Sequence, residues 1–211
     1  MKKTLYVLIA ITLIIVTGKF IHSNYTKWGQ KVQPVNINGA IIKKPKNLIS
    51  FNLNQGNNIN YSDTNLHDKW SVLFFGYTTC PDICPTTLTK LSDMYKGLDS
   101  ISKKHRPNIV FISIDPEHDA DDQADKYAKY FNQNFVGLTG NQNQITELRN
   151  NLGVVAQKIA LDPENAQNYI YDHSSTLFII NPRGQLQAIL SGPHKTENMI
   201  KDYKAIINKF G

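Results

Sequence analysis

The chain has few cysteines, and its first 46 residues contain no acidic side chain. Among 211 residues there are only two cysteines, Cys80 and Cys84. Two neighbouring cysteines cannot staple a fold of this size, which excludes a disulfide-rich scaffold, and they are too few for a four-cysteine zinc site. Hydrophobic residues make up 41% and charged residues 19% of the chain, which argues against a disordered protein. The length suits one ordinary domain or two very small ones.

The positive charge is concentrated near the amino terminus. The formal net charge is +6, and residues 1–46 contain eight lysines without any aspartate or glutamate. Residues 47–211 therefore carry a charge of −2 and are nearly neutral. They contain no basic stripe with interleaved aromatic side chains, so the sequence does not predict nucleic-acid binding.

The basic start is followed by an apolar segment. Two lysines precede Thr4–Gly18, which is uncharged and dominated by Leu, Ile and Val. Extended to Ile21 as a helix, the segment is about 27 Å long, a length within the range of membrane-spanning helices. A cleaved signal peptide and an uncleaved anchor both fit this pattern. Because Val16–Gly18 is a poor cleavage site, we favour an anchor over residues 1–21.

The lysine pair predicts the topology of the chain. Under the positive-inside rule the lysines stay in the cytoplasm, so the body of the chain is exported. This predicts a single-pass protein of the inner, cytoplasmic membrane with its domain on the periplasmic side. Residues 22–46 show little periodicity and are interpreted as a linker, and residues 47–211 as the folded domain.

Beyond the linker, strand patterns alternate with helix patterns. Strands are predicted over residues 48–53, 59–61, 70–77, 108–115, 135–138, 154–160, 176–181 and 185–191, and helices over residues 85–104, 119–131, 144–152 and 196–210. The last two strands flank Pro182-Arg183-Gly184, which indicates a hairpin. The order predicts an α/β fold, a central mixed sheet with helices on both faces. A cysteine pair at the exit of the first central strand is typical of a thioredoxin-like arrangement.

The cysteine pair lies where a buried strand runs into a helix. The strand Trp70–Tyr77 leads into Thr78–Pro85 (TTCPDICP), and Pro85 suits the first turn of a helix. The helix dipole and the free N–H groups of that turn favour a thiolate. Spaced as Cys-x-x-x-Cys, the two sulfurs can form a disulfide or converge on one ion. Buried structural cysteines are the less favoured alternative, since the turn is marked by proline in an exported chain.

One histidine is placed to complete a metal site. His173 directly precedes the predicted strand 176–181, and in a thioredoxin-like fold that loop faces the cysteine loop. A structural role is the alternative to ligation. Two thiolates and one imidazole suit copper in either oxidation state and also suit zinc, so the residues alone predict a soft-metal or redox site. Other histidines are interpreted as linker, surface, turn or loop residues: His22, His67, His105, His118 and His194.

Three blocks resemble the Sco/SenC family of copper-binding cytochrome c oxidase assembly proteins. They are Phe75–Leu88 (FGYTTCPDICPTTL), Phe111–Glu117 (FISIDPE) and Asp172–Ser175 (DHSS), in the family's order. The resemblance covers residues 48–210 and implies a thioredoxin-like fold. It also implies that Cys80, Cys84 and His173 are copper ligands, for Cu(I) or Cu(II). Asp115 is interpreted as a turn residue before Pro116 and not as a ligand.

Two functions compete at this point. The resemblance implies a membrane-tethered copper chaperone that matures the copper centre of cytochrome c oxidase, with the copper-site subunit or another cuproprotein as its partner. The alternative is a thiol–disulfide oxidoreductase acting on cysteines of exported proteins. A peroxiredoxin-type peroxidase is disfavoured, because that family has threonine where this chain has Tyr77. We expect a monomer.

Overall fold

The computed structural model describes residues 13, 15–19, 36–57, 59–120, 122–165 and 168–211. The chain divides into two compact units, residues 1–35 and residues 36–211. Of the first unit, the described residues are helical. Within the described ranges, no helix is long and apolar enough to cross a membrane. Most of the predicted anchor over residues 1–21 lies outside the described residues, so the anchor remains a prediction.

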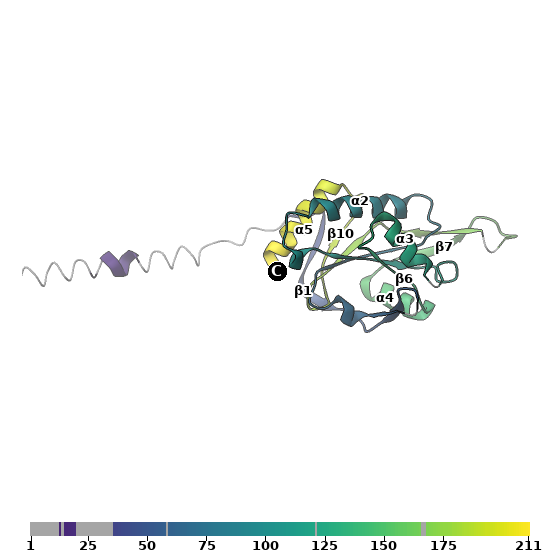
Figure 1. The fold of residues 1–211 in the computed structure, drawn as a ribbon, viewed down its shortest axis with the longest axis horizontal. Coiled ribbons are helices and arrows are strands. Elements are labelled where there is room, and N and C mark those ends of the chain that lie inside the picture. The colour runs from purple at the N-terminus through teal and green to yellow at the C-terminus, as the bar shows by residue number, and fades with distance from the viewer. Residues whose placement is uncertain (1–12, 14, 20–35, 58, 121, 166–167) are drawn as a thin grey trace, which may run out of the picture. The chain divides into compact units, whose positions relative to one another are not determined.

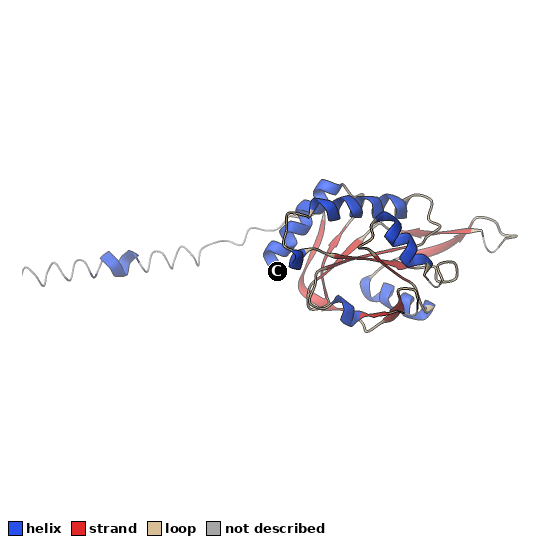
Figure 2. Cartoon of the chain, in the orientation of Figure 1, coloured by secondary structure: helices blue, strands red, loops and turns tan. Residues whose placement is uncertain are grey.

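The second unit is built on a six-stranded mixed sheet (Figures 1 and 2). The strand order is β1-β10-β9-β4-β5-β6, in which β4, β5 and β6 are parallel and the β1, β10, β9 and β4 neighbours are antiparallel. The bounds are β1 (Gly39–Asn47), β4 (Ser71–Gly76), β5 (Asn108–Ser113), β6 (Val136–Leu138), β9 (Leu177–Ile180) and β10 (Gln185–Leu190). Every residue of β4 is buried, as its continuous apolar run predicts for a central strand.

Helices cover both faces of this sheet. In Figure 1, α2 (Ile83–Gly97), α3 (Gln123–Phe131) and α5 (Thr196–Phe210) lie above the sheet, and α4 (Gln142–Leu152) lies below it. On α5 the apolar Met199, Tyr203, Ile206 and Ile207 are buried on the face toward the sheet, together with the polar Asp202. α4 is capped at its start by Asn141, whose side chain accepts a hydrogen bond from Asn143 N–H, and at its end by Gly153, which has a left-handed φ of 74°. The predicted mixed sheet between helices is confirmed.

Two small hairpins and two short helices complete the unit. β2 (Asn52–Asn54) pairs with β3 (Asn60–Ser62), and β7 (Ala156–Ala160) pairs with β8 (Tyr169–His173), both antiparallel. The 3₁₀ helices are η1 (Asp63–Leu66) and η2 (Lys103–His105). The helix predicted over residues 85–104 ends at Gly97, and the chain continues in turns, in which Asp99 N–H donates to the Lys96 carbonyl oxygen and Ile101 N–H to that of Leu98. The sequence did not predict β8 as a strand.

Part of the predicted linker belongs to the sheet. Residues 39–46, assigned to the linker, lie in β1, which pairs with β10 at the edge of the sheet, so the folded unit starts before residue 47. Lys43 and Lys44 are exposed on this strand and give the segment the composition of a linker. Lysines on an edge strand discourage pairing with a second chain, which is the physical reason that strand and linker look alike here.

Candidate metal centre

The cysteine pair lies at the carboxyl end of the central strand. β4 ends at Gly76, and the chain turns so that Cys80 N–H donates to the Tyr77 carbonyl oxygen at 3.3 Å. α2 begins at Ile83, which places Cys84 in the first helical turn with Pro85 next to it. The backbone N–H groups of a first turn have no partner within the helix. The Cys84 N–H is one of these groups, and it donates to Cys80 Sγ at 3.3 Å.

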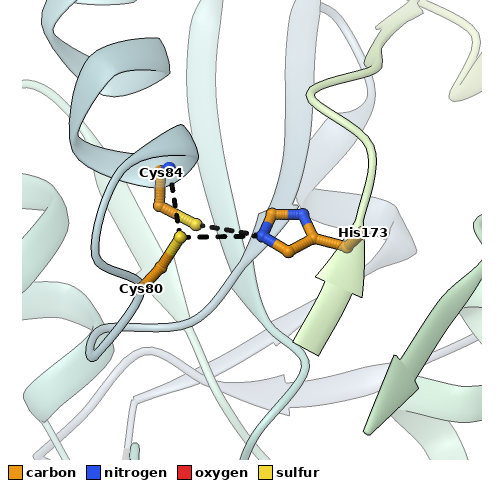
Figure 3. Close-up of side chains that lie close together, drawn as sticks. All are labelled: Cys80, Cys84 and His173. Atoms are coloured by element: carbon orange, nitrogen blue, oxygen red, sulfur yellow. Dashed lines mark hydrogen bonds between the residues drawn. The ribbon is translucent and has the colours of Figure 1, made fainter. Parts of the chain in front are cut away.

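His173 reaches the cysteines through the pairing of β4 with β9. The two strands are antiparallel, and Leu177 at the start of β9 pairs with Phe74 near the end of β4. The residues just before β9 therefore lie at the same edge of the sheet as the cysteine loop. His173 is the last residue of β8, four positions before β9. In Figure 3 its ring points toward the two sulfur atoms from the strand opposite α2.

The three side chains converge closely enough to hold one ion. His173 Nε2 lies 3.4 Å from Cys84 Sγ and 3.9 Å from Cys80 Sγ, and the three ligand atoms all lie within 4.8 Å of one another. A first-row metal bound at about 2.3 Å from sulfur and about 2.0 Å from nitrogen separates those atoms by about 3.8 Å in a trigonal plane. The side chains therefore fit a three-coordinate ion after shifts of a few tenths of an ångström.

The contacts of His173 aim one ring nitrogen at the sulfurs. Its Nδ1 lies 3.1 Å from the Ser174 carbonyl oxygen, which can only accept, so Nδ1 carries the proton and donates. Nε2 then keeps its lone pair for an ion beside the thiols. The ring packs against the side chains of Phe74 and Tyr77, with ring centroids 6.4 Å and 5.7 Å away. These contacts hold the imidazole in a ligating orientation before any metal arrives.

The two thiols have opposite acidities. The hydrogen bond from the Cys84 side chain, with further ones from backbone N–H groups, lowers the pKa of Cys80 to about 4. Burial raises the pKa of the Cys84 thiol, and the neighbouring Cys80 thiolate raises it further. At neutral pH the metal-free centre therefore holds one thiolate, Cys80, which accepts a hydrogen bond from the Cys84 thiol.

This asymmetry predicts a distinctive pH profile for alkylation of the metal-free chain. An ordinary cysteine has a pKa of about 8.5, so its reaction with iodoacetamide slows tenfold per pH unit below that value. Since the pKa of Cys80 is about 4, we expect its alkylation rate to stay constant from pH 8 down to about pH 5. The rate is measured by mass spectrometry of the peptide carrying Cys80.

A matched variant tests the cause of the profile. Cys84→Ala removes the thiol that donates to Cys80. The midpoint of the Cys80 profile should then move to higher pH, whereas Cys84→Ser, which keeps a donor, should move it less. A wild-type midpoint near the value of a free cysteine would contradict the assignment of Cys80 as the thiolate.

Several polar residues around the site were not predicted from the sequence. Tyr77, buried beside His173, accepts a hydrogen bond from Tyr171 N–H at 3.2 Å and so connects the cysteine loop to β8. Tyr169, also on β8, donates to the buried Asp115 carboxylate at 2.9 Å. Asp115 thus contacts the strand that carries His173. No sequence signal marks these tyrosines, because their partners come from distant segments.

The other histidines that the structure describes do not join the site. Among the described residues, Cys80, Cys84 and His173 form the only cluster of His, Cys, Asp and Glu side chains that could hold an ion. His118 was interpreted as an exposed turn residue, but it is partly buried and contacts Asp115 and Tyr169. His194 is a buried loop residue whose Nε2 lies 2.5 Å from the Ser175 carbonyl oxygen.

The fold and the site together define a class of protein. They describe a thioredoxin-like α/β domain with a buried Cys-x-x-x-Cys pair at a helix start and a histidine facing it. Residues 40–208 match the family model described as SCO1/SenC, so the chain belongs to the SCO1/SenC family. The resemblance found in the sequence blocks is thereby confirmed.

Individual relatives agree in sequence and in fold. The SCO2-like protein of Rickettsia conorii is 36% identical over 137 residues, which cover 64% of this chain and 64% of that protein. The solution structure of apo Sco1 from Thermus thermophilus has a TM-score of 0.71 and 32% identity, covering 82% of this chain and 99% of that one. The crystal structure of Arabidopsis thaliana ScoI with copper bound has a TM-score of 0.68 and 28% identity, covering 76% and 98%.

Proposed function

We propose that this chain is a copper chaperone that binds copper through Cys80, Cys84 and His173 and helps to mature the copper centre of cytochrome c oxidase. The observation that carries this proposal is the convergence of two buried sulfurs and one imidazole nitrogen within 4.8 Å. Two sulfurs and one nitrogen suit Cu(I) and also Cu(II). Membership of the SCO1/SenC family and the copper-bound relative ScoI support copper as the ion.

The protonation states of the ligands decide how copper is taken up. Cys80 is already a thiolate, so it supplies the first ligand without losing a proton. Cys84 gives up its proton to solvent as copper binds, because ligation requires the thiolate. His173 keeps its proton on Nδ1 and binds through Nε2. Copper binding therefore releases about one proton at neutral pH, and acid weakens it.

Exposure suggests the direction from which copper leaves. Cys84 has no exposed surface, whereas 7% of Cys80 is exposed. An incoming thiolate of a partner meets Cys80 first, so ligand exchange starts at Cys80 and ends with release from the buried Cys84. The partner in this proposal is the copper-site subunit of the oxidase or another cuproprotein that presents cysteines.

The cellular setting of this proposal rests on the amino-terminal sequence. The lysine pair and the apolar run up to Ile21 support a single-pass anchor over residues 1–21 in the inner membrane. The domain then works on the periplasmic side as a monomer. A tether keeps the carrier close to a membrane-bound oxidase and raises its effective concentration there.

A second candidate function is favoured by the unequal thiols. A thiolate with a pKa of about 4 beside a protonated thiol is the arrangement of a thiol–disulfide oxidoreductase, in which one cysteine attacks and the other resolves. In this role Cys80 attacks a disulfide of the partner, and the Cys84 thiolate then closes an internal disulfide as the partner's thiol leaves. Oxidation of this pair to the disulfide removes both sulfur ligands and switches copper binding off.

A complemented deletion strain tests the proposed role. We expect the wild-type gene to restore cytochrome c oxidase activity at limiting copper and Cys80→Ser to restore none, since the variant lacks both a ligand and the attacking thiolate. His67→Ala, at an exposed histidine outside the metal centre, serves as the control and should restore full activity. Full restoration by Cys80→Ser would contradict both functions. The readout is oxidase activity in membranes, with the variants expressed at equal levels.

A further inference from the structure

A buried carboxylate accepts hydrogen bonds from the loop that carries the cysteines. Asp119 has no exposed surface and lies outside the Cys-Cys-His cluster. One of its carboxylate oxygens accepts hydrogen bonds from Thr78 N–H at 2.9 Å and Ser113 Oγ at 2.6 Å, and the other accepts from Thr78 Oγ1 at 2.5 Å. Three donors satisfy this buried charge, and two of them come from a residue only two positions before Cys80.

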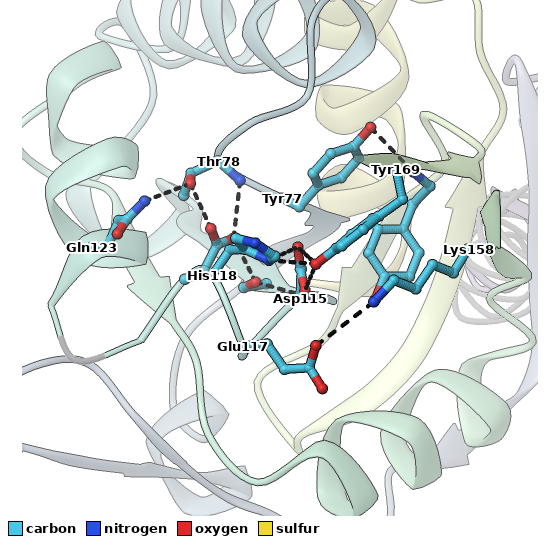
Figure 4. A network of polar contacts seen from close by, with 11 residues as sticks. Tyr77, Thr78, Asp115, Glu117, His118, Gln123, Lys158 and Tyr169 are labelled. Atoms are coloured by element: carbon cyan, nitrogen blue, oxygen red, sulfur yellow. Dashed lines mark hydrogen bonds and ion pairs between the residues drawn. The ribbon is translucent and has the colours of Figure 1, made fainter. Parts of the chain in front are cut away.

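Thr78 is held from both sides. Its hydroxyl donates to Asp119 and accepts a hydrogen bond from Gln123 Nε2 at 3.0 Å, at the start of α3 (Figure 4). Bonds to both the backbone and the side chain of one residue fix its position and its orientation together. The cysteine loop is therefore attached to a neighbouring element at the point where it leaves β4.

The segment from Asp115 to Asp119 reaches both halves of the metal centre. At its far end Asp119 bonds Thr78 of the cysteine loop, and at its near end Asp115 accepts from Tyr169 of β8, the strand that ends in His173. Ser113 at the end of β5 connects the two, because its Oγ donates to Asp119 and accepts from Asp115 N–H at 3.0 Å. Figure 4 shows the contact of Gln123 with Thr78 and, on the other side of the network, the contacts among Asp115, His118 and Tyr169.

We propose that Asp119 is a positioning residue for the metal centre, which sets the place of the Cys80 sulfur relative to His173 by holding Thr78. The proposal rests on the proposed copper function, and it adds a residue that does not touch the ion. Groups that orient metal ligands typically contribute about 10–100-fold to metal affinity. Because Asp119 acts on the loop and not on the ion, its loss should change the geometry of the site while the three ligands remain.

Three variants separate the contacts of Asp119. Asp119→Asn keeps the shape but replaces one accepting oxygen with an NH₂ group, so it cannot accept from both the hydroxyl and the backbone of Thr78. Thr78→Val keeps the backbone donor and loses the hydroxyl, whereas Thr78→Ser keeps both donors. We expect copper affinity to fall by about 10–100-fold in Asp119→Asn and by less in Thr78→Val. Thr78→Ser, which keeps both donors, should have the copper affinity of the wild type.

A second buried carboxylate provides the matched control. Asp125 on α3 is 8% exposed and accepts hydrogen bonds from Gly137 N–H at 3.1 Å and from Lys129 Nζ at 2.5 Å. None of these partners lies in the cysteine loop or in β8. Asp125→Asn should therefore lower the thermal midpoint of unfolding, as Asp119→Asn does, and leave copper binding unchanged.

The test combines a copper titration with hydrogen exchange. The purified full-length chain and each variant are titrated with Cu(II), and the sulfur-to-copper charge-transfer absorption gives affinity and geometry. Amide hydrogen exchange of the metal-free chains is measured by mass spectrometry in the peptide around Thr78 and Cys80 and, as reference, in α5. We expect weaker binding, shifted absorption bands and faster exchange of the cysteine loop in Asp119→Asn, with α5 unchanged.

The outcomes distinguish this proposal from the proposed function. Unchanged bands, affinity and loop exchange in Asp119→Asn would overturn the positioning role. If the wild-type chain bound no copper, the proposed function would be wrong. Amide hydrogen exchange of the cysteine loop in the metal-free chains would still decide whether Asp119 positions that loop. If Asp119→Asn fails to fold, the comparison of Thr78→Val with Thr78→Ser answers the same question. Equal behaviour of these two variants then overturns the proposal.

Discussion

Replacing His173 with alanine should lower the copper affinity of this chain by more than about 100-fold. Residues that only orient metal ligands typically contribute about 10–100-fold, and His173 is proposed as a ligand itself. The imidazole supplies the one nitrogen of the site, 3.4 Å and 3.9 Å from the two sulfurs. Without it two thiolates remain for the ion, and a partly covered two-coordinate site loses copper readily to competing thiols. The loss should therefore be largest when glutathione is present in the titration.

The same substitution separates the two candidate functions. The largest cause of the low pKa of Cys80 is the hydrogen bond from the Cys84 side chain. His173→Ala should therefore retain most of the rate of thiol–disulfide exchange with a model disulfide while copper binding collapses. Affinity is measured by competition with a chromophoric Cu(I) chelator, and exchange by the release of thionitrobenzoate from a mixed disulfide.

A control is needed, because removing a buried ring also leaves a cavity. His194 is buried to the same degree as His173, with 5% of each exposed, and it lies outside the metal cluster. His194→Ala should lose stability in the same way, by about 2–5 kcal/mol for a large-to-small core change, and keep its copper. Equal copper affinity in wild type and His173→Ala would remove the histidine from the site.

Gly76→Ala should damage both the fold and the metal centre. A Cβ at this position would lie 2.5 Å from Cys84 Sγ and 2.9 Å from Phe111 Cε2, closer than side-chain atoms approach each other. Both neighbours are fully buried, so neither has free space into which to move. Overpacking of this kind typically costs about 1–3 kcal/mol of unfolding free energy. The Cys84 sulfur is displaced from its place beside His173, so copper binding weakens as well.

A second glycine gives the matched control for this substitution. At Gly97, the last residue of α2, an added Cβ would meet Ile200 Cδ1 at 2.4 Å, which is the end of a flexible side chain. Gly97→Ala should cost little, because Ile200 can rotate and alanine favours a helix. Thermal unfolding and copper titration of the two variants make the comparison. Wild-type copper affinity in Gly76→Ala would show that the close packing behind Cys84 is not needed.

Local patterns were enough to predict most of the sheet and helices. The continuous apolar run of β4, the proline-marked start of α2 and the alternation of strands and helices produced the α/β fold, and the final helix has the predicted bounds. β1 was missed because its exposed lysines have the composition of a linker, and only pairing with β10 makes it a strand. β8 was missed because its side chains contact distant residues, Tyr171 the ring of Tyr77 and Tyr169 the carboxylate of Asp115.

The sequence by itself determined the chemistry of this protein. A cysteine pair that follows a buried strand and opens a helix is a local feature, and it requires no distant residue to be reactive. The three blocks around the cysteines, Asp115 and His173 also carried the family, which residues 40–208 then matched. These features depend on residues that are close in the chain, which is why they can be read from it.

Only the tertiary structure decided how these residues work together. His173 lies 89 positions after Cys84 and meets it because β9 runs antiparallel to β4. The unequal thiols arise because the Cys84 thiol and N–H point at Cys80 while burial keeps Cys84 protonated. The hydrogen bond from Thr78 N–H to Asp119 joins two residues that are 41 positions apart in the chain. Distances, burial and hydrogen-bond partners set pKa values and ligand geometry, and they exist only once the chain is folded.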